Sequence, residues 1–595
     1  MIRSFLFNSL LAAAYCMLPT QAKPQSTPVS DKSWIKTSDS YTQLLIDIDN
    51  KYSPENGTDQ GLAEYDTLVS VPTLRNEQAK RKELEALLNI YKTALNKKMA
   101  EPVKQDLQIL INRLQLDFRL QDYYLANQVP FLNAAASVYD GLESLLDQQT
   151  PENRRAAVVE RLRKYAGLTA GYRPLTAIYT ERVKEQMAKP GIIYPSRQEI
   201  DLELSRNASV MDGIEALCKK YNLSGWEHPY AQLKKQIADY DAWTKSVVLP
   251  RGRTDFKLPP AEYALKFQEY GIDIPPAQIA KMAHERFTQI QEEMKGLAAQ
   301  IAKARHLSSA DYRDVIRELK KNQLHGDSII PVYEQHLKDI EAIIREHQIV
   351  SLPDRPAIIR LATAAETARQ PAPHMVPPPF LNNTGQRGVF VLPLNMPEAP
   401  GAKSVDKYDD FTFDAASWTV TAHEARPGHE MQFDKMVEEG VSKARALYAF
   451  NSTNVEGWGL YSEYLIRPYM PDEGKLVSLD YLLLRAARAF LDPELQAGKI
   501  TADQAFKVLT DDVVQSRAFA REEVERFTLN APGQANSYFY GFTKMLAMRK
   551  DTEQALGSRF NLMRFHDFIL SQGLLPPDLL RKAVEEDFIP QENKN

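Results

Sequence analysis

Apolar residues recur at helical spacing over most of the chain. From residue 279 they lie three to five positions apart, the spacing that gathers side chains on one face of a helix. The apolar positions of this stretch are Ile279, Met282, Phe287, Ile290, Met294 and Leu297. Asp273 and the prolines at 275 and 276 precede it as start signals. Residues 76–131 form a second such region, rich in leucine and charged residues and poor in proline. The pattern predicts a mainly α fold built from amphipathic helices around a core.

The pattern changes between residues 351 and 400, where prolines gather and repeatedly interrupt helix. Within this segment, residues 388–394 form a short β-branched and aromatic run bounded by glycine and proline, which predicts an edge strand able to align an extended peptide. We therefore expect an N-terminal helical region (23–350), a proline-rich connector (351–400) and a C-terminal helical region (401–595). The two helical regions are expected to intertwine as one domain.

Residues 1–22 have the pattern of an export signal. Arg3 supplies a positive start, residues 5–18 are mostly apolar, and a cleavage site is expected between Ala22 and Lys23. A membrane anchor is the lesser interpretation, because the apolar run is too short to cross a bilayer comfortably. Lipid attachment at Cys16 is disfavoured, because the preceding residue is a tyrosine rather than a small residue. The mature chain is expected to be exported to the periplasm, with no membrane span.

Composition and charge narrow the function classes. The 595 residues carry 73 Lys and Arg against 78 Asp and Glu, a formal net charge of -5, so there is no basic excess to neutralise phosphates. Nucleic acid is therefore not expected as a partner. Without the first 22 residues the chain keeps only Cys218, which excludes an internal disulfide and a cysteine-rich metal site.

Two of the ten histidines lie in one seven-residue stretch, from His423 to His429, with Glu424 beside the first. Two imidazoles and a neighbouring carboxylate are the ingredients of a catalytic zinc site. A spacing of six residues puts the rings about 240° apart on a regular helix, so an undistorted helix cannot place both on one ion. Pro427 and Gly428 are able to break the helix, and we expect this interruption to bring both rings to one face. The alternative is an ordinary helix end flanked by surface histidines.

Three ordered motifs resemble those of the bacterial "domain of unknown function 885" family. Residues 423–432, HEARPGHEMQ, resemble its HExxPGHxxQ motif, residues 454–463, NVEGWGLYSE, resemble its VEGWALYxE segment, and residues 532–541 resemble its PxQAxxYxxG segment. Gly459 stands where the family usually has alanine, and Glu430 stands where many members have another histidine. The resemblance extends from about residue 40 to residue 590. It implies a large helical metallopeptidase-like body with a deep cleft and a small β element near the site.

The similarity of that family to helical gluzincin peptidases, such as carboxypeptidase Taq, thimet oligopeptidase and angiotensin-converting enzyme, implies a third ligand that is a Glu on a following helix. Glu456 matches that place, 27 residues after His429. A competing interpretation is a capping box, in which Glu456 bonds back to the start of its own helix at Thr453. Glu463 is the alternative ligand. It lies seven residues after Glu456 on the same helical face and is better suited to orienting a ligand histidine.

Two His and one Glu leave one position of a zinc ion open, as catalytic sites require. We therefore expect a zinc-dependent hydrolase with Glu424 as the general base. The similarity to the helical gluzincins implies short or unfolded peptides as the substrates. By resemblance, Tyr538 is the donor to the oxyanion, with Tyr540 as the fallback. A weaker hypothesis places the carboxylate of a peptide on Arg549 and Lys550. The competing functions are a non-catalytic metal- or peptide-binding protein and a zinc hydrolase of another amide or ester. The choice between exopeptidase and oligopeptidase activity stays open, as does the oligomeric state.

Overall fold

In the computed structural model, helices form nearly all of the regular structure, so the predicted mainly α fold is confirmed. The structure describes residues 32–363, 366–367, 370, 372–393 and 408–594. The expected export signal lies outside these residues.

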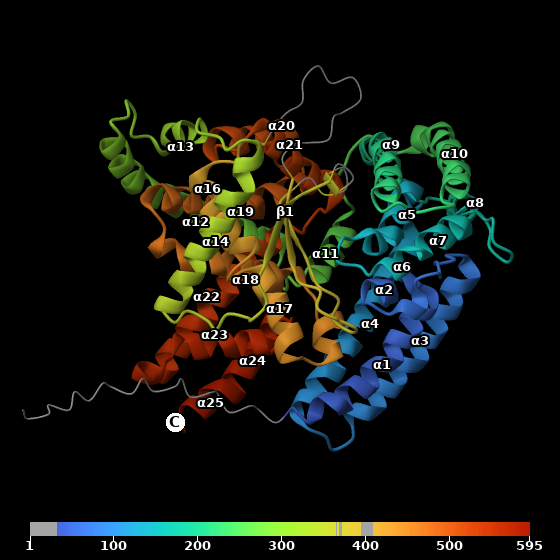
Figure 1. The fold of residues 1–595 in the computed structure, drawn as a ribbon, viewed down its shortest axis with the longest axis horizontal. Coiled ribbons are helices and arrows are strands. Elements are labelled where there is room, and N and C mark those ends of the chain that lie inside the picture. Colours follow the sequence, from blue (N-terminus) through green and yellow to red (C-terminus); the bar gives the residue numbers. More distant parts are fainter. Residues whose placement is uncertain (1–31, 364–365, 368–369, 371, 394–407, 595) are drawn as a thin grey trace, which may run out of the picture.

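The N-terminal helices gather on one side of the molecule, at the right in Figure 1. They are α1 (Trp34–Tyr52), α2 (Pro54–Asp59), α3 (Leu74–Leu95), α4 (Glu101–Asn127), α5 (Ala134–Glu143), α6 (Glu152–Arg155), α7 (Ala157–Tyr165), α8 (Leu175–Met187), α9 (Arg197–Lys220), α10 (Glu227–Trp243) and α11 (Pro260–Glu269). Helices α1, α3 and α4 share one core, and helices α5 and α7–α10 share another. The predicted helical region 76–131 corresponds to α3 and α4.

The opposite side of the molecule is built from helices on both sides of the connector in sequence (Figure 1). Those before it are α12 (Pro276–Arg305), α13 (Tyr312–Lys320) and α14 (Ile329–Glu346). Those after it are α16 (Asp414–Glu424), α17 (His429–Glu439), α18 (Ser452–Ile466), α19 (Asp472–Gln496), α20 (Ala502–Lys507), α21 (Arg517–Glu525), α22 (Asn536–Leu556), α23 (Leu562–Ser571), α24 (Pro577–Ala583) and α25 (Ile589–Glu592).

Helix α12 is the predicted helix that starts at the paired prolines, and it packs along α19. Its apolar face buries Ile279, Ile290 and Met294, and Phe287 meets Phe490 of α19 edge to face at 5.4 Å. One large hydrophobic core therefore joins helices from before and after the connector. This packing supports the helices that carry the candidate site.

The connector contributes a three-stranded sheet of β1 (Ile358–Leu361), β2 (His374–Val376) and β3 (Val389–Leu392). The strand expected within residues 388–394 is β3, but its expected position at an edge is wrong. β3 lies in the centre, parallel to β1 and antiparallel to β2, and all four of its residues are buried. Its unbroken apolar run fits a central strand, which is covered on both faces. It therefore has no free edge with which to align a peptide.

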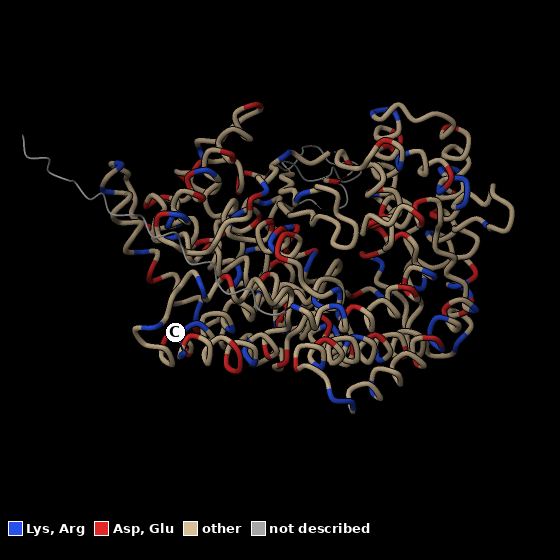
Figure 2. The backbone as a smooth tube through the Cα atoms, turned by 60° about the horizontal axis from the view of Figure 1, so that its bottom comes forward, with Lys and Arg blue, Asp and Glu red and all other residues tan. Residues whose placement is uncertain are grey.

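Positively and negatively charged residues are interspersed along the described chain (Figure 2). A cavity of about 500 Å³ lies between the N-terminal helices and the sheet, lined among others by Tyr139, Arg360 and Pro377–Pro379. The deep cleft expected over the site stays a prediction.

None of the helices within the described residues is long and apolar enough to cross a membrane.

Candidate metal centre

The chain between α16 and α17 leaves the helical path. Helix α16 ends at Glu424, Ala425 has φ -102° and ψ -100°, Gly428 has φ -72° and ψ -137°, and α17 starts at His429. The peptide bond between Arg426 and Pro427 is cis. A side chain at position 428 would place its Cβ 1.8 Å from the carbonyl oxygen of His423, so only glycine allows this close approach. The Pro-Gly pair therefore breaks the helix, as the spacing of the histidines required.

The break brings the two imidazoles together. The ring centroids of His423 and His429 are 4.6 Å apart and the rings are nearly perpendicular. Glu456 of α18 completes the cluster, with its Oε2 atom 3.6 Å from Nε2 of His423 and 3.4 Å from Nε2 of His429. Three ligand atoms around a tetrahedral zinc with bonds of about 2.1 Å lie about 3.4 Å from one another. The two distances to Glu456 therefore fit one such ion, and the three ligand atoms all lie within 4.8 Å of one another.

The chemistry of the cluster also fits zinc, which binds imidazole nitrogen and carboxylate oxygen. Oε2 of Glu456 is buried and has no hydrogen-bond partner among the described residues. Burial opposes the charged form of this carboxyl, but the two imidazoles hold the pKa of Glu456 well below its ordinary value. A buried, ionised oxygen facing two ring nitrogens is a position that a cation would satisfy.

The alternative interpretation of Glu456 as a capping residue is wrong. The N-cap of α18 is Asn451, whose side chain accepts a hydrogen bond from the N–H of Asn454 at 2.8 Å. The N–H of Thr453, which a capping box would offer to Glu456, donates instead to the carbonyl of Tyr270. The carboxylate of Glu456 is therefore free to face the histidines.

Glu463 lies on the other side of the His423 ring. Its Oε1 atom accepts a hydrogen bond from Nδ1 of His423 at 2.8 Å, and its Oε2 atom accepts one from the hydroxyl of Thr419 at 2.7 Å. Arg485 of α19 forms an ion pair with Oε1 at 3.4 Å. Burial opposes the charged form of this carboxyl, but Arg485 and these hydrogen bonds hold the pKa of Glu463 below its ordinary value. The bond fixes the tautomer of His423 that leaves Nε2 free to bind a metal.

Glu424 follows His423 and is 8 % exposed. Its Oε2 atom is buried with no hydrogen-bond partner among the described residues. Burial raises the pKa of Glu424 to about 8, although the nearby His429 acts in the opposite direction. A carboxyl with a pKa near neutrality is suited to accepting a proton and returning it.

Tyr538 of α22 packs beside the cluster. Its ring is nearly parallel to that of His423 at a centroid distance of 6.3 Å. The fallback residue Tyr540 donates its hydroxyl to Asp273, so it has another partner. Arg549 donates to Glu553 at 2.7 Å and to Tyr461 at 3.2 Å, which leaves it engaged away from the cluster. Of these residues, the structure brings only Tyr538 to the histidines.

The third motif positions Tyr538 against α18. The N–H of Gly533, a residue with φ +92°, donates to Asp492 at 2.8 Å. Gln534 donates to Ser452 at 3.0 Å, and Ser452 shares a 2.6 Å hydrogen bond with Ser537. These contacts join the loop before α22 to the first turn of α18, one turn before Glu456.

Two glycines let α18 and α22 cross closely. A Cβ at Gly541 would lie 2.0 Å from the carbonyl oxygen of Thr453, and a Cβ at Gly457 would lie 2.6 Å from the carbonyl carbon of Gly541. Both glycines belong to the motifs. Their role is therefore to bring the helix of Glu456 and the helix of Tyr538 together.

The two departures from the family pattern lie at the site. A Cβ at Gly459 would lie 2.6 Å from Cε1 of His423 and 2.9 Å from Cε1 of His429, so the alanine usual in the family would press on both rings as they stand here. Glu430 forms an ion pair with the buried Arg426 at 2.8 Å and supports the turn instead.

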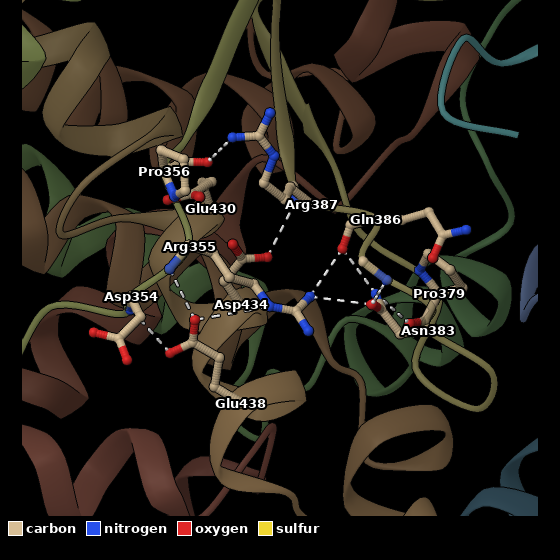
Figure 3. Close-up of polar contacts among 12 residues, drawn as sticks. Asp354, Arg355, Pro356, Pro379, Asn383, Gln386, Arg387, Glu430, Asp434 and Glu438 are labelled. Atoms are coloured by element: carbon tan, nitrogen blue, oxygen red, sulfur yellow. Dashed lines mark hydrogen bonds and ion pairs between the residues drawn. The ribbon is translucent and has the colours of Figure 1, made fainter.

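The connector holds α17 from its outer side (Figure 3). The backbone N–H groups of Asp354 and Arg355 donate to Glu438 at 3.2 and 3.0 Å, and the N–H of Gly388 donates to Asp434 at 3.1 Å. On the inner side, the indole of Trp458 donates to the carbonyl of Pro427 at 2.8 Å. The segment carrying His429 is therefore fixed on both sides.

Several residues of the site were not found from the sequence, namely Thr419, Arg485 and the supporting Trp458. Trp458 lies within a recognised motif, and this was a usable signal. Thr419 and Arg485 lie in ordinary helical sequence, and only the fold brings them to Glu463.

One comparison with known proteins identifies the family, and another shows a shared fold. Residues 54–584 match the family described as bacterial protein of unknown function (DUF885). The solved structure of a "putative lipoprotein of unknown function" from Shewanella oneidensis is 19% identical with a TM-score of 0.69, covering 93% of this chain and 100% of that one. A "putative lipoprotein" from Colwellia psychrerythraea is 19% identical with a TM-score of 0.70, covering 94% and 98%. No curated protein matches the chain.

Proposed function

The chain belongs to the DUF885 family of bacterial proteins, and we propose that it is a zinc-dependent hydrolase that cleaves peptide bonds. His423, His429 and Glu456 would hold the ion. When bound, zinc would supply a Lewis acid that activates water and polarises the scissile carbonyl. The proposal extends to short or unfolded peptides, because the site residues are largely buried and a folded protein could not bring a peptide bond to them.

The observation that carries the proposal is the buried carboxyl of Glu424. A site that holds a metal only for structure has no use for an unpartnered carboxyl next to a ligand, because burying such a group is costly. Glu424 would take a proton from the attacking water and pass it to the departing amine. Its raised pKa, about 8, suits a group that changes protonation state twice in each turnover.

Tyr538 would donate its hydroxyl to the oxygen on which negative charge develops. Burial raises the pKa of Tyr538 to about 12, so the phenol keeps its proton at neutral pH. A positioned donor of this kind typically contributes about 10²- to 10³-fold in rate. Glu463 orients His423 and does not touch the substrate.

The test is the substitution Glu424→Gln, which keeps the size of the side chain and removes its basicity. We expect one zinc per chain by mass spectrometry of the metal in both proteins. Hydrolysis of a library of fluorescence-quenched peptides should fall by about 10²- to 10⁴-fold in the variant. The matched control is Glu292→Gln, a change in a 65% exposed side chain on α12. Equal turnover in the wild type and in Glu424→Gln would contradict the role of Glu424. A wild-type protein that binds zinc but hydrolyses no peptide would support the competing function, a non-catalytic binding protein.

The proposal includes export to the periplasm. It is supported by the signal-like pattern of residues 1–22 and by the printed description of each of the two similar structures as a "putative lipoprotein". The intact mass of the purified mature protein tests it. We expect a mass that corresponds to cleavage before Lys23. A mass that includes a lipid-modified Cys16 would indicate a membrane-anchored form in place of the free periplasmic one. A chain that starts at Met1 would contradict processing.

A further inference from the structure

Asp492 is a fully buried carboxyl that accepts hydrogen bonds from two separate segments of the chain. Its Oδ1 atom accepts from the hydroxyl of Tyr263 on α11 at 2.8 Å, and its Oδ2 atom accepts from the backbone N–H of Gly533 at 2.8 Å. Asp492 itself lies near the C-terminal end of α19. One side chain therefore joins a helix of the N-terminal region, a helix of the C-terminal region and the loop of the third motif.

Helix α11 also packs directly against this loop. Gly533 has φ +92°, in the left-handed region that favours glycine, and a Cβ at this position would lie 3.4 Å from the ring of Phe267 and 3.5 Å from the ring of Tyr263. These two rings contact each other, with their centroids 5.0 Å apart. The place of Gly533 is therefore fixed by two aromatic side chains of α11 as well as by Asp492.

Gly533 is coupled to Tyr538 through the start of α22. Its carbonyl oxygen accepts from the backbone N–H of Asn536, the first residue of that helix, at 3.4 Å and from the side-chain amide of Asn536 at 3.1 Å. Tyr538 lies in the same first turn, and its ring centroid lies 6.3 Å from that of His423. A shift of Gly533 would therefore move the tyrosine relative to the histidine.

The two donors explain why a carboxyl is buried at this position. Burying an ionisable group is costly, and an amide side chain of the same size would avoid much of that cost. An asparagine, however, has one oxygen and one NH₂ group, so it could not accept from Tyr263 and Gly533 at two separate oxygens. Asp492 has two oxygens, and both are used.

We propose that Asp492 is a positioning residue for Tyr538, on which it acts through Gly533 and the first turn of α22. The inference rests on the proposed function, in which Tyr538 donates its hydroxyl to the developing oxyanion. A misplacement of about 1 Å in a reacting group can cost about 10²-fold in rate. Because Tyr263 supplies the second hydrogen bond, α11 takes part in the same positioning. The N-terminal region would thus contribute to the reaction, although none of the predicted site residues lies in it.

The test is a double-mutant cycle between Asp492→Asn and Tyr538→Phe, measured by hydrolysis of a fluorescence-quenched peptide with the zinc-loaded protein. We expect Asp492→Asn to lower kcat by about tenfold or more while KM and the zinc affinity change by less than about twofold, because only a transition-state contact is lost. In the Tyr538→Phe background the same change should alter kcat by less than about twofold, since the two residues act as one unit. Losses that multiply independently would overturn the proposal, and so would an unchanged kcat in Asp492→Asn.

Tyr263→Phe is a milder second variant, which serves if Asp492→Asn does not fold. It removes one of the two hydrogen bonds and keeps the carboxyl and the motif loop, so kcat should fall by about threefold or more, and only where Tyr538 is present. The matched control is Tyr240→Phe, which removes a buried hydroxyl that donates to the carbonyl of Leu132 at 2.9 Å in the N-terminal region and should leave kcat unchanged. Equal kcat values for Tyr263→Phe and the wild type would contradict the role of α11.

A crystallographic comparison separates this inference from the proposed function, because it requires no turnover. In the zinc-loaded wild type the ring of Tyr538 is expected beside that of His423, and in Asp492→Asn it should be displaced by about 1 Å or more. If the wild type hydrolyses no peptide, the proposed function fails, and the displacement alone decides the role of Asp492. An undisplaced ring in the variant overturns the positioning role while leaving peptide hydrolysis intact.

Discussion

At the scale of single residues, His423 depends on a charged acceptor supplied by another helix. Glu463 lies 40 residues further along the chain and accepts the Nδ1–H bond, while Arg485 and Thr419 hold Glu463 in place. Removing such a partner usually changes metal affinity more than it changes the fold, because the ligand itself is retained.

We predict that Glu463→Gln weakens zinc binding by about 10- to 100-fold. The amide oxygen can still accept the hydrogen bond, but the negative charge that increases the basicity of His423 is lost and Arg485 loses its ion-pair partner. Competition with a chromophoric chelator measures the affinity. Glu292→Gln is the control, and an affinity equal to that of the wild type would remove Glu463 from the site.

A second histidine provides a prediction on stability. His566 is fully buried; its Nδ1 atom donates to the carbonyl of Ile349, and its Nε2 atom accepts from Tyr461. Burial lowers the pKa of His566 to about 3, whereas an unfolded histidine has a pKa of about 6.5. Between these values the unfolded chain binds the proton and the folded chain does not, so stability falls as pH falls.

This group should therefore lower the free energy of unfolding by about 2 kcal/mol between pH 6.5 and pH 5. Urea unfolding of the wild type and of His566→Gln at both pH values measures the effect. The variant is expected to be less stable at pH 6.5 but to lose less stability on acidification. Parallel losses in the two proteins would show that His566 takes up a proton in the folded state.

The motifs were sufficient to predict where six residues of the candidate site lie in the chain, because their order and spacing are local. They could not decide between a ligand and a capping role for Glu456, since both use the same short pattern. The choice depended on Asn451 and on the carbonyl of Tyr270, which lies far away in sequence. Arg485 carries no local signal at all.

At the scale of elements, the candidate site depends on the distance between α18 and α22. Gly457 and Gly541 face each other at the crossing, where no side chain fits. A methyl group at position 541 would meet backbone atoms of α18, which cannot turn aside as a side chain can. Insertion of carbon into such a contact typically costs about 1–3 kcal/mol.

We predict that Gly541→Ala lowers the melting temperature and weakens zinc binding together, because moving α22 also moves the helix that carries Glu456. The matched control is Gly296→Ala on α12, where an added Cβ has no neighbour within 4 Å. That change should be neutral or stabilise the protein by up to about 1 kcal/mol through helix propensity. Equal melting temperatures for Gly541→Ala and the wild type would show that the crossing can widen freely.

The connector shows what a local pattern can predict and what it cannot. The apolar run at 388–394 predicted a strand, and β3 forms there. Its central position depends on β1 and β2, which are short runs among prolines. These two strands pair with residues of β3 that lie up to 31 positions away in the sequence. The α12 helix, by contrast, repeats its apolar face over 30 residues and was predictable from periodicity.

At the scale of the whole molecule, a buried arginine joins the N-terminal helices to the C-terminal region. Arg445 forms an ion pair with Asp106 of α4 at 2.9 Å and donates to Gln105 at 3.0 Å and to Gln572 at 2.7 Å. Arg445 and Asp106 are 3% and 1% exposed. Breaking a buried pair leaves one charge without a partner, which typically costs about 3–5 kcal/mol.

We predict that Arg445→Met destabilises the protein by this amount while the zinc affinity of the folded fraction stays unchanged, because Arg445 is not among the contacts of the metal cluster. Denaturant unfolding and chelator competition measure the two quantities. Arg113→Met removes an exposed pair with Asp117 on the same helix α4 and should cost less than about 1 kcal/mol. Equal losses for the two variants would contradict a special role for Arg445.

The helical class of the molecule followed from composition and periodicity, because most helices have one clear apolar face. The distribution of its cores did not, because α12–α14 precede the connector and still pack into the same core as the helices after it. That packing places α19, with its arginines, against both α12 and the candidate metal centre.

Anomalous X-ray scattering at the zinc edge from crystals of the zinc-loaded protein tests the central claim most directly. We predict one strong peak per chain, about 2.0–2.2 Å from Nε2 of His423, Nε2 of His429 and a carboxylate oxygen of Glu456. In Glu456→Ala the peak should weaken or disappear. A full-strength peak at another position, or an unchanged peak in that variant, would contradict the assignment of these three residues as the ligands.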